Sequence, residues 1–233
     1  YWAQLDSLPE RMRRALRDGL WDTFEGQAFT EFSREMHVIA PYTIPDSWTR
    51  WTGTDYGYVD PWCTLWLARS PDRQQVVVYR EAYEKGLTAR EQAKRVKLLT
   101  GRESLRLHVA DPSMWSQRER LSSESIADEY AMEGVALAAG NNDRLAGKAK
   151  VHEALAWERL QARVNPPRLH IFSTCANLIR TLEVLPLSET RVEDVDTKAE
   201  DHAYDSLRYA LMVEGQRSRP SETPEHGLRI EVR

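Results

Sequence analysis

Three aspartates, far apart in the sequence, stand where a carboxylate could do chemistry. Asp55 ends an apolar stretch in the segment TGTDYGY, and Asp111 ends the stretch LRLHVA, where Pro112 stops the expected strand at once. Asp205 lies in the segment EDHAYDSLRYAL, which has the spacing of a helix. Carboxylates at the ends of regular elements can meet in one site although the chain separates them.

Such a trio suits phosphodiester hydrolysis assisted by divalent cations. The reaction must neutralise a highly charged transition state and activate water, and two Mg²⁺ or Mn²⁺ ions about 4 Å apart do both. Hard cations of this kind take oxygen ligands, and an aspartate on a central strand can bridge two of them. We therefore expect Asp55, Asp111 and Asp205 to be metal ligands and catalytic residues.

The helix segment carries two further groups beside Asp205. His202 precedes Asp205 by three residues and shares a helix face with it, so it could orient Asp205, contact the scissile phosphate or assist proton transfer. Asp201 is adjacent and is a candidate for a place near the metal ions. Gly53 and Gly57 flank the first aspartate, where the lack of side-chain bulk lets a large ligand approach the backbone.

Each aspartate also has an ordinary structural interpretation. An aspartate after a strand is usually a turn residue or a helix cap, and Asp205 alone could be a solvated helix residue. Two strand-end carboxylates and one helix carboxylate in otherwise apolar elements weaken that interpretation without removing it. Spacing alone leaves both interpretations open.

Composition indicates a globular protein with one full domain. Of the 233 residues, 41% are hydrophobic and 29% charged, which allows a sizeable core. No apolar run is long enough to span a bilayer and no signal-peptide pattern is present, so we expect a cytoplasmic protein without a membrane partner. For Cys63 and Cys175 we expect two buried thiols, with a disulfide as the alternative.

The net charge of −4 argues against a protein that coats nucleic acid through bulk basicity. A nuclease needs only a local basic rim to hold phosphates. The candidates for such a rim are Arg144, Lys148 and Lys150 in the segment NNDRLAGKAK, where the first two are four residues apart and share a helix face. The alternative is a solvated helix face.

The helices and strands that position these residues are predicted from the spacing of apolar residues and from the residues that interrupt helices and strands. We expect strands over residues 48–55, 62–69, 75–83, 105–110, 135–140 and 169–172, and helices over 88–99, 125–134, 145–163, 175–185 and 199–213. Thr88 and Glu91 form a capping-box pattern, and Leu155 and Leu160 should face inward on the long helix. A meander followed by alternating helices and strands predicts an α/β fold, a mixed sheet with helices on both faces.

The chain divides into three parts on these patterns. Residues 1–47 are expected to be an irregular lead-in with a short amphipathic helix at 5–18, residues 48–215 the main domain, and residues 216–233 a flexible polar tail. The chain opens with Tyr1 in what reads as the middle of a helix, so we expect a fragment of a longer polypeptide. It contains no GxxxxGK[ST] motif, so no ATP site is assigned to it.

Most of these segments resemble the large terminase subunit of tailed double-stranded DNA bacteriophages, specifically its C-terminal nuclease domain. The resemblance is carried by TGTDYGYVDPWCTLWLA, VVVYREAYEKGLT, LHVADPSMW, ANLIRTLEVLPLS and EDVDTKAEDHAYDSLRYALM, and WDTFEGQAFTEF is similar to the stretch that follows the packaging ATPase domain. The last block is the most specific, because family members typically end in a DHxxDALRY-like helix. Here the segment is DHAYDSLRY, with Ser206 in place of the usual alanine.

The resemblance implies an RNase H-like fold and a metal-dependent endonuclease that cuts concatemeric double-stranded DNA during viral genome packaging. Carried over by motif, the acidic triad falls on Asp55, Asp111 and Asp205, with His202 beside the last and Asp60 of YVDP near the metals. The implied cofactors are two Mg²⁺ or Mn²⁺ ions. The implied partners are double-stranded DNA, a portal protein and the small terminase subunit, in the host cytoplasm, with the isolated domain monomeric.

Two other functions stay open at this stage. Another RNase H-like nuclease, such as a junction resolvase or a transposase core, would share the triad and would prefer branched DNA. A non-catalytic module that docks on the portal or on DNA belongs to a different class, and the three carboxylates argue against it. Binding of divalent metal discriminates between an enzyme and a docking module.

Overall fold

A mixed α/β sheet with helices on both faces organises the chain, as the sequence predicts. The computed structural model describes residues 26–116, 124–159, 164–191 and 193–214. The seven-stranded sheet has the order β1-β9-β4-β3-β2-β5-β6. Its strands are β1 (Val38–Ile39), β2 (Thr49–Asp55), β3 (Trp62–Arg69), β4 (Val76–Glu84), β5 (Leu105–Ala110), β6 (Leu137–Ala139) and β9 (Leu169–Phe172).

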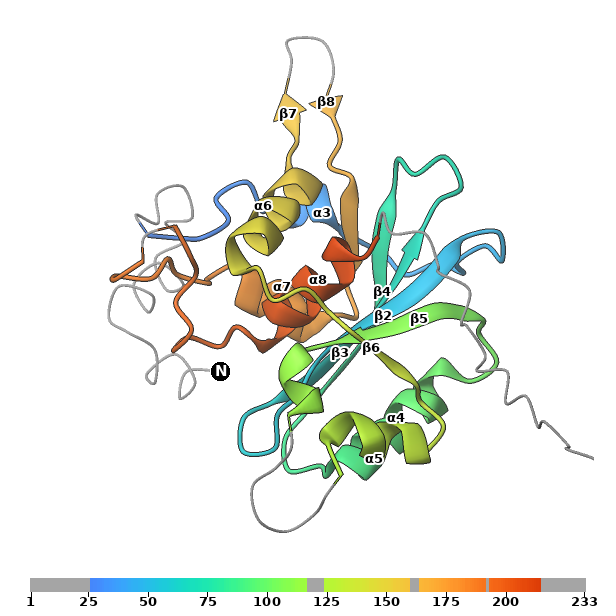
Figure 1. The fold of residues 1–233 in the computed structure, drawn as a ribbon. Helices are drawn as coiled ribbons and strands as arrows, with labels where there is room; N and C mark the ends of the chain where they lie inside the picture. The colour runs from blue at the N-terminus through green and yellow to red at the C-terminus, as the bar shows by residue number, and fades with distance from the viewer. Residues whose placement is uncertain (1–25, 117–123, 160–163, 192, 215–233) are drawn as a thin grey trace, which may run out of the picture.

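Helices cover the sheet from two sides (Figure 1). One side carries α6 (Arg144–Leu155), α7 (Ala176–Leu182) and α8 (His202–Met212), and the other carries α4 (Ala89–Thr100) and α5 (Ile126–Met132). The shorter elements are α3 (Arg34–His37), the 3-10 helix η1 (Pro112–Trp115) and a hairpin of β7 (Glu158–Arg159) and β8 (Val164–Asn165). Cover on both faces explains why β3 is buried along almost its whole length.

The central strands bring two chain segments to one edge of the sheet. Strands β2, β3 and β4 form an antiparallel meander, while β5 pairs parallel to β2. Because parallel strands end at the same edge of a sheet, the carboxyl ends of β2 and β5 lie side by side, where ligands bind in open α/β sheets. The edge at which β2 and β5 end is called the acidic edge below.

Helix α8 lies directly on strand β2. A Cβ atom at Gly53 would stand 2.1 Å from the carbonyl oxygen of Ser206 and 2.8 Å from Cβ of Ala210, so only glycine allows this approach. The indole nitrogen of Trp51 donates to the carbonyl oxygen of Ala210 at 2.9 Å. Every residue from Ala203 to Leu211 is buried, because the sheet covers one side of α8 and the neighbouring helices cover the other.

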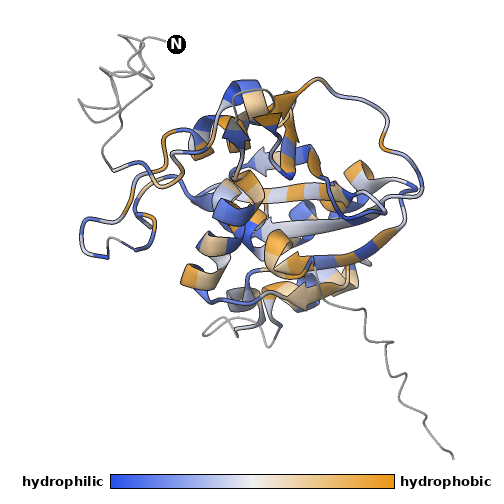
Figure 2. Ribbon diagram, turned by 90° about the horizontal axis from the view of Figure 1, so that it is seen from above, coloured by the Kyte–Doolittle hydropathy of each residue, from blue (hydrophilic) through white to orange (hydrophobic). Residues whose placement is uncertain are grey.

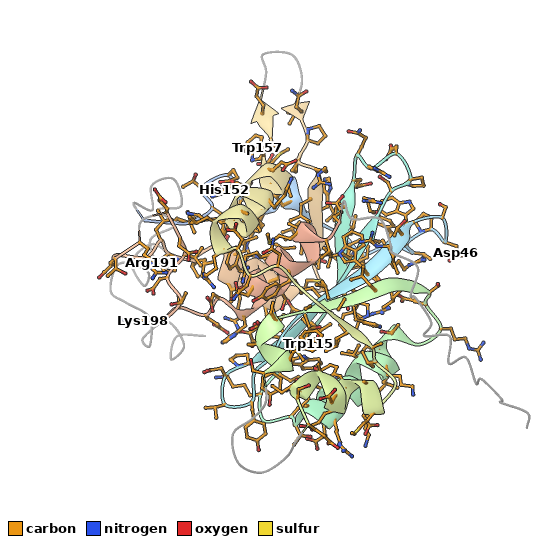
Figure 3. All side chains as sticks on the ribbon, viewed as in Figure 1. Asp46, Trp115, His152, Trp157, Arg191 and Lys198 are labelled. Carbon is orange, nitrogen blue, oxygen red and sulfur yellow. The ribbon has the colours of Figure 1, made fainter. Side chains whose placement is uncertain are left out.

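The long helix predicted over residues 145–163 is wrong over residues 156–159, and residues 160–163 lie outside the described part of the chain. The chain leaves α6 after Leu155 and forms the β7–β8 hairpin, in which Glu158 pairs with Asn165. Trp157, at the base of the hairpin, donates from its indole nitrogen to the carbonyl oxygen of Glu31 at 2.8 Å (Figure 3). Residues with high helix propensity thus yield to a tertiary contact. Leu160 lies outside the described residues.

Other expectations need smaller corrections. The strand predicted over 135–140 is β6, which is partly exposed rather than buried, because it forms an edge of the sheet. Residues 34–39, expected to be irregular, form α3 and β1, and β1 pairs parallel with β9. The helices predicted over 175–185 and 199–213 are shorter, as α7 and α8. The helix predicted at 5–18 and the tail at 216–233 lie outside the described residues.

Local signals and burial otherwise agree with the sequence. The capping box of Thr88 and Glu91 starts α4, and the two cysteines, Cys63 and Cys175, are buried free thiols. Among the described residues no helix is long and apolar enough to cross a membrane. Figure 2 shows hydrophobic and hydrophilic residues interleaved along the ribbon, as expected for elements that pack on a core with one face.

Candidate active site

Asp55 ends β2 at the acidic edge, and its side chain is buried. Its carboxylate oxygen Oδ2 is hydrogen-bonded to Nδ1 of His202 at 2.9 Å. His202 is the first residue of α8, and α8 is held close to β2 by the contact at Gly53. The packing of α8 on β2 therefore brings together two residues 147 positions apart.

Asp111 follows β5 at the same edge. Its backbone N–H donates to the carbonyl oxygen of Thr54 at 3.0 Å, which extends the parallel pairing of β5 with β2. Its carboxylate oxygen Oδ1 accepts from the backbone N–H of Ser113 at 2.8 Å and caps η1. Asp111 is thus a cap, as the ordinary interpretation expects, and it also directly follows β5, the strand that pairs with β2, which Asp55 ends.

Asp205 on α8 is held by two guanidinium groups. Nε of Arg208 donates to Oδ1 of Asp205 at 2.9 Å, and Nη1 of Arg144 donates to Oδ2 at 3.3 Å. Arg208 is fully buried. Its guanidinium stacks 4.2 Å from the ring centroid of Tyr209, and its Nη1 reaches the carbonyl oxygen of Asn141 at 3.5 Å. Both oxygens of Asp205 therefore face a positive charge.

Arg144, the first residue of α6, contacts two more carboxylates. Its Nε donates to Oδ2 of Asp194 at 2.7 Å, and its Nη2 lies 3.6 Å from Oδ2 of Asp201. Burial lowers the pKa of Arg144, but the bond to Asp194 and the negative charges of Asp205, Asp194 and Asp201 outweigh it and raise that pKa overall. The guanidinium therefore stays charged among three aspartates.

Negative charge is in excess at the acidic edge. The pKa of Asp55 is raised to about 6, mainly by burial; the hydrogen bond to His202 lowers that pKa, and the charges of Asp205 and Asp111 help to raise it. Burial likewise raises the pKa of Asp201 to about 7, with Asp205 adding to the effect. Buried carboxylates that repel one another in this way are typical of functional sites. An added cation would relieve the repulsion.

Asp60 lies on the exposed loop between β2 and β3. A Cβ at Gly57 would come within 2.4 Å of the carbonyl oxygens of Asp60 and Pro61, so the glycine permits a tight loop beside the site. The hydrogen bond to Asp55 raises the pKa of His202 most; burial opposes it, and the charges of Asp55, Asp201 and Asp60 add to the rise. Asp60 is therefore an electrostatic neighbour of His202.

The three basic residues predicted to touch DNA have different surroundings. Arg144 and Lys148 share a face of α6, as their spacing predicts, but this face covers the segment that precedes α8. Nζ of Lys148 donates to the carbonyl oxygen of Glu193 at 2.9 Å. Lys150 is exposed and pairs with Glu153 at 2.7 Å. The contact of these residues with phosphates stays a prediction.

Sequence reasoning missed Asp194 as a partner in the site. It lies between α7 and α8 in a segment without periodicity, and its contact with Arg144 joins residues 50 positions apart, so no local signal identifies it. Within the described ranges, no three histidine, cysteine or acidic side chains are already grouped to hold one metal ion. The acidic edge is instead a set of carboxylates interleaved with arginines.

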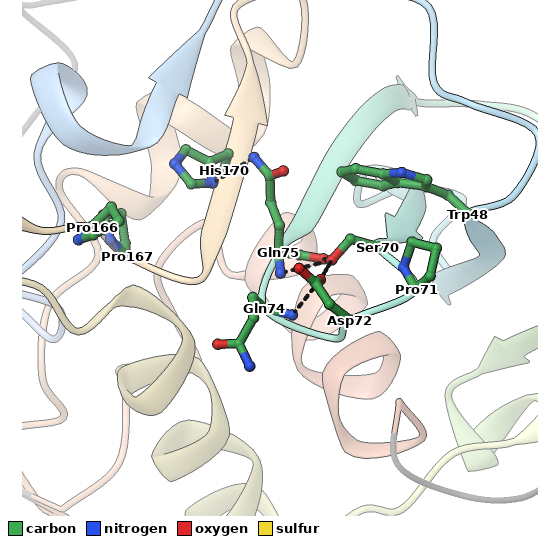
Figure 4. Close-up of a pocket in the computed structure, with 9 residues that line it drawn as sticks. All are labelled: Trp48, Ser70, Pro71, Asp72, Gln74, Gln75, Pro166, Pro167 and His170. Carbon is green, nitrogen blue, oxygen red and sulfur yellow. Dashed lines mark hydrogen bonds between the residues drawn. The ribbon is translucent and has the colours of Figure 1, made fainter.

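An open pocket of about 720 Å³ lies at the opposite edge of the sheet (Figure 4). Its lining comes from the turn between β3 and β4 and from the start of β9, and consists of Trp48, Ser70, Pro71, Asp72, Gln74, Gln75, Pro166, Pro167 and His170. None of the residues predicted to be catalytic lines it. Asp55, Asp111 and Asp205, which the sequence predicts to hold metal, lie at the acidic edge instead.

Solved structures share this fold. No family model matches the sequence, and no curated protein matches it. The nuclease domain of the bacteriophage P22 large terminase is similar, with a TM-score of 0.64 and 19% identity over 81% of this chain and 92% of that chain. The large terminase of the thermophilic bacteriophage D6E has a TM-score of 0.64 and 17% identity, over 88% of this chain and 52% of that one.

A third similar structure is the nuclease domain of the large terminase g2p from bacteriophage SPP1 with bound Mn. Its TM-score is 0.50 and its identity 15%, over 70% of this chain and 84% of that chain. The chain spans about half of the D6E protein, at 52%, and most of the two nuclease domains. At these identities the likeness establishes the fold, which is the RNase H-like fold of terminase nuclease domains.

Proposed function

We propose that this chain is the nuclease domain of a viral DNA-packaging terminase, an endonuclease that cuts double-stranded concatemeric DNA with divalent cations. One observation carries the proposal. Asp55 ends β2, and Asp111 directly follows the neighbouring parallel strand β5. Helix α8 brings His202 and Asp205 to Asp55, which is buried and repelled by both of the other aspartates. This concentration of carboxylates on the edge where ligands bind is unusual for a purely structural region.

The donor set fits Mg²⁺ or Mn²⁺. Every candidate ligand is a carboxylate oxygen, which is the ligand that hard cations prefer. In this proposal Asp55, Asp111 and Asp205 would hold two ions, which would supply charge stabilisation of the transition state and activation of water. The Mn in the SPP1 nuclease domain supports this choice of cation.

The residues of the chain orient the ligands. His202 binds Oδ2 of Asp55 through Nδ1 and so fixes the plane of that carboxylate, which leaves Nε2 as the atom for contact with a phosphate oxygen. Arg208 fixes Asp205 through Oδ1 from a fully buried position. Such outer contacts determine where a ligand oxygen points.

The wider biological role follows from the fold likeness and from the sequence resemblance. The partners proposed are double-stranded DNA, the portal protein and the small terminase subunit, and ATP hydrolysis is assigned to a part of the terminase outside this chain. Lys150 and the exposed parts of α6 are proposed to contribute to the basic rim that holds the phosphates.

Plasmid cleavage with purified protein in Mg²⁺ or Mn²⁺ tests the proposal. Outer partners of metal ligands alone are worth about ten- to a hundredfold in activity, so Asp55→Asn, Asp111→Asn and Asp205→Asn should each lower the cleavage rate by at least that factor. Asp46→Asn is the matched control, because Asp46 is exposed and lies far from the acidic edge (Figure 3). Undiminished cleavage by the Asp55 variant would remove the proposed mechanism.

A parallel assay with a four-way DNA junction defines the substrate. A packaging nuclease should cut linear duplex at least as fast as the junction. A strong preference for the junction would assign the same acidic edge to a resolvase instead.

A further inference from the structure

Arg144 has an unusual position for a residue at the start of a helix. The carboxylate of Asp143 accepts from the backbone N–H of Ala146 at 3.0 Å and fixes the first turn of α6. From this turn the Arg144 side chain extends away from α6 and meets three aspartates from the segment before α8 and from α8 itself. About a quarter of the Arg144 side chain, 24%, is exposed.

The three contacts of Arg144 differ in strength. The bond to Asp194 is short, at 2.7 Å, and Asp194 is itself fixed, because its Oδ1 accepts from the backbone N–H of Val195 at 2.8 Å. The contacts to Asp205 and Asp201 are longer, at 3.3 and 3.6 Å. Nη2 of Arg144 is buried and makes no hydrogen bond within the described residues. Nε of the guanidinium is thus held by a short bond, while Nη1 makes one longer hydrogen bond and Nη2 makes only a charge contact.

Nη1 and Nη2 of Arg144 lie where negative charge is in excess. Asp205 is a proposed metal ligand, and Asp201 is crowded by Asp205. Arg208 also touches Asp205, but through the other oxygen and from a buried position. Oδ2 of Asp205, the oxygen that faces Arg144, is therefore the one for which a mobile cation and the guanidinium compete.

We propose that Arg144 acts as a counter-cation at the acidic edge, where its guanidinium holds Asp201 and Asp205 in place. A divalent cation must compete with this guanidinium for Oδ2 of Asp205. This inference rests on the proposed function. Asp194 gives the guanidinium a place to remain when the cation binds, because that contact involves Nε and is separate from Nη1 and Nη2. Arg144 is thus a positioning residue that lowers the affinity of the acidic edge for metal.

Lys148 offers a matched control for Arg144. It lies one turn further along the same face of α6 and binds the same segment through the carbonyl oxygen of Glu193. No ion pair joins it to Asp201 or Asp205 among the described residues. Lys148→Gln therefore removes one positive charge and one contact between α6 and the segment, as Arg144→Gln does, but leaves those two aspartates untouched.

The experiment is calorimetric titration of the full 233-residue chain with Mg²⁺ or Mn²⁺ alone. Because a nearby positive charge opposes a divalent cation, Arg144→Gln should lower the dissociation constant roughly tenfold, while Lys148→Gln leaves it within about twofold of the parent protein. In a thermal melt without metal, Arg144→Gln should melt earlier than the parent protein and gain more from added Mn²⁺. An unchanged or weaker affinity in Arg144→Gln, or equal gains in both variants, overturns the inference.

A second variant keeps the test decisive if Arg144→Gln does not fold. Arg144→Lys keeps the charge but cannot reach three carboxylates with a planar fork, so its metal affinity should lie between those of the parent protein and Arg144→Gln. Failure of the inference is separable from failure of the proposed function. If the parent protein binds metal, Asp55→Asn abolishes binding and both Arg144 variants match the parent, only the inference fails; if the parent protein binds no metal, the proposed function fails as well.

Discussion

The two ends of helix α8 carry opposite arrangements of charge. At its N-terminal end, Asp201 and Asp205 face Asp55 at the acidic edge. At its C-terminal end, Glu214 and the last carbonyl groups are contacted by three arginines, which are Arg69, Arg106 and Arg168. Both arrangements follow the helix dipole, which favours negative charge at the start and positive charge at the end. They differ in how completely the charges are matched.

The C-terminal end of α8 is closed by strong contacts. Arg69 donates to the carbonyl oxygen of Glu214 at 2.6 Å and Arg106 to that of Val213 at 2.7 Å. Arg168 binds both carboxylate oxygens of Glu214, at 2.6 and 2.8 Å. Carbonyl groups at the end of a helix need such donors. This end stabilises the fold.

The N-terminal end of α8 is left unbalanced. Burial and like charges raise the pKa of Asp55 to about 6 and that of Asp201 to about 7, which means that the ionised forms cost folding free energy. Sites of this kind are retained where function needs them, at the expense of stability. The comparison teaches that one helix can stabilise the fold at one end and carry the proposed ligand site at the other.

The largest effect is expected for Gly53→Ala, which disturbs both ends of α8 together. Its Cβ would stand 2.1 Å from the carbonyl oxygen of Ser206, so α8 must move off β2, at a cost of about 3 kcal/mol in unfolding free energy. Urea denaturation measures the loss, and cleavage should fall with it. Ala139→Val, on the exposed edge strand β6, is the control, and equal stability of the two variants would contradict the close packing.

The next effect concerns the C-terminal end alone. Glu214→Gln leaves Arg168 without its charged partner and should lower the unfolding free energy by about 2 kcal/mol. Binding of Mn²⁺ should stay as in the parent protein, because this end lies away from the acidic edge. Stability and calorimetry on the same preparation check both points. A weakened Mn²⁺ site in this variant would show that the two ends are not independent.

A smaller effect of opposite sign is expected for Asp201→Asn at the N-terminal end. Since the native pKa of Asp201, about 7, lies above its ordinary value of 3.8, the folded form binds the proton more tightly than the unfolded form. Ionised Asp201 therefore destabilises the protein above that pKa, and the penalty fades as the pH falls towards the ordinary value. The substitution should add about 1 kcal/mol at roughly pH 8 and nothing near pH 4.

Urea denaturation in the presence of EDTA, repeated across this pH range, measures the effect of Asp201→Asn. A variant that is less stable than the parent protein at the upper pH would show that the neighbours of Asp201 compensate the charge of its ionised form.

The smallest effect is expected for Lys150→Gln, and it tests where DNA lies relative to the two ends of α8. Lys150→Gln should lower the slope of duplex affinity against salt by roughly one unit if Lys150 contacts a phosphate. Arg73→Gln, in the exposed turn between β3 and β4 beside the open pocket at the opposite edge of the sheet, should leave the slope unchanged. Fluorescence anisotropy with a labelled duplex over a salt series measures both. A larger change for Arg73 would place the duplex on the opposite edge of the sheet.

Local signals made much of the fold predictable. The bounds of β3 and β5 follow from apolar runs that end at turn residues, and the capping box of Thr88 gives the start of α4. The β7–β8 hairpin was not predictable, because its residues favour a helix and the contact that overrides them joins Trp157 to Glu31, 126 positions away. Local helix propensity contains no information about a partner so distant in the chain.

The candidate site divides in the same way. Asp55 and Asp111 were found because each ends a strand, and His202 because it shares a helix face with Asp205. The roles of Arg144 and Asp194 depend on how α6 approaches the segment before α8, which no periodicity encodes. Sequence thus identified the other carboxylates but not Asp194, and it assigned Arg144 to DNA contact rather than to the three aspartates that it pairs with. Whether the carboxylates act as metal ligands stays a prediction.

The buried position of Arg208 fixes a positive charge beside the acidic edge. A Cβ at Gly147 would come within 2.3 Å of Cγ of Arg208, so the glycine leaves the space that the Arg208 side chain occupies. The ring of Tyr209 packs against its guanidinium. A guanidinium keeps its proton at any pH that a folded protein meets. Arg208 therefore contributes one positive charge beside Asp205 that is fixed by its packing and that no change of pH removes.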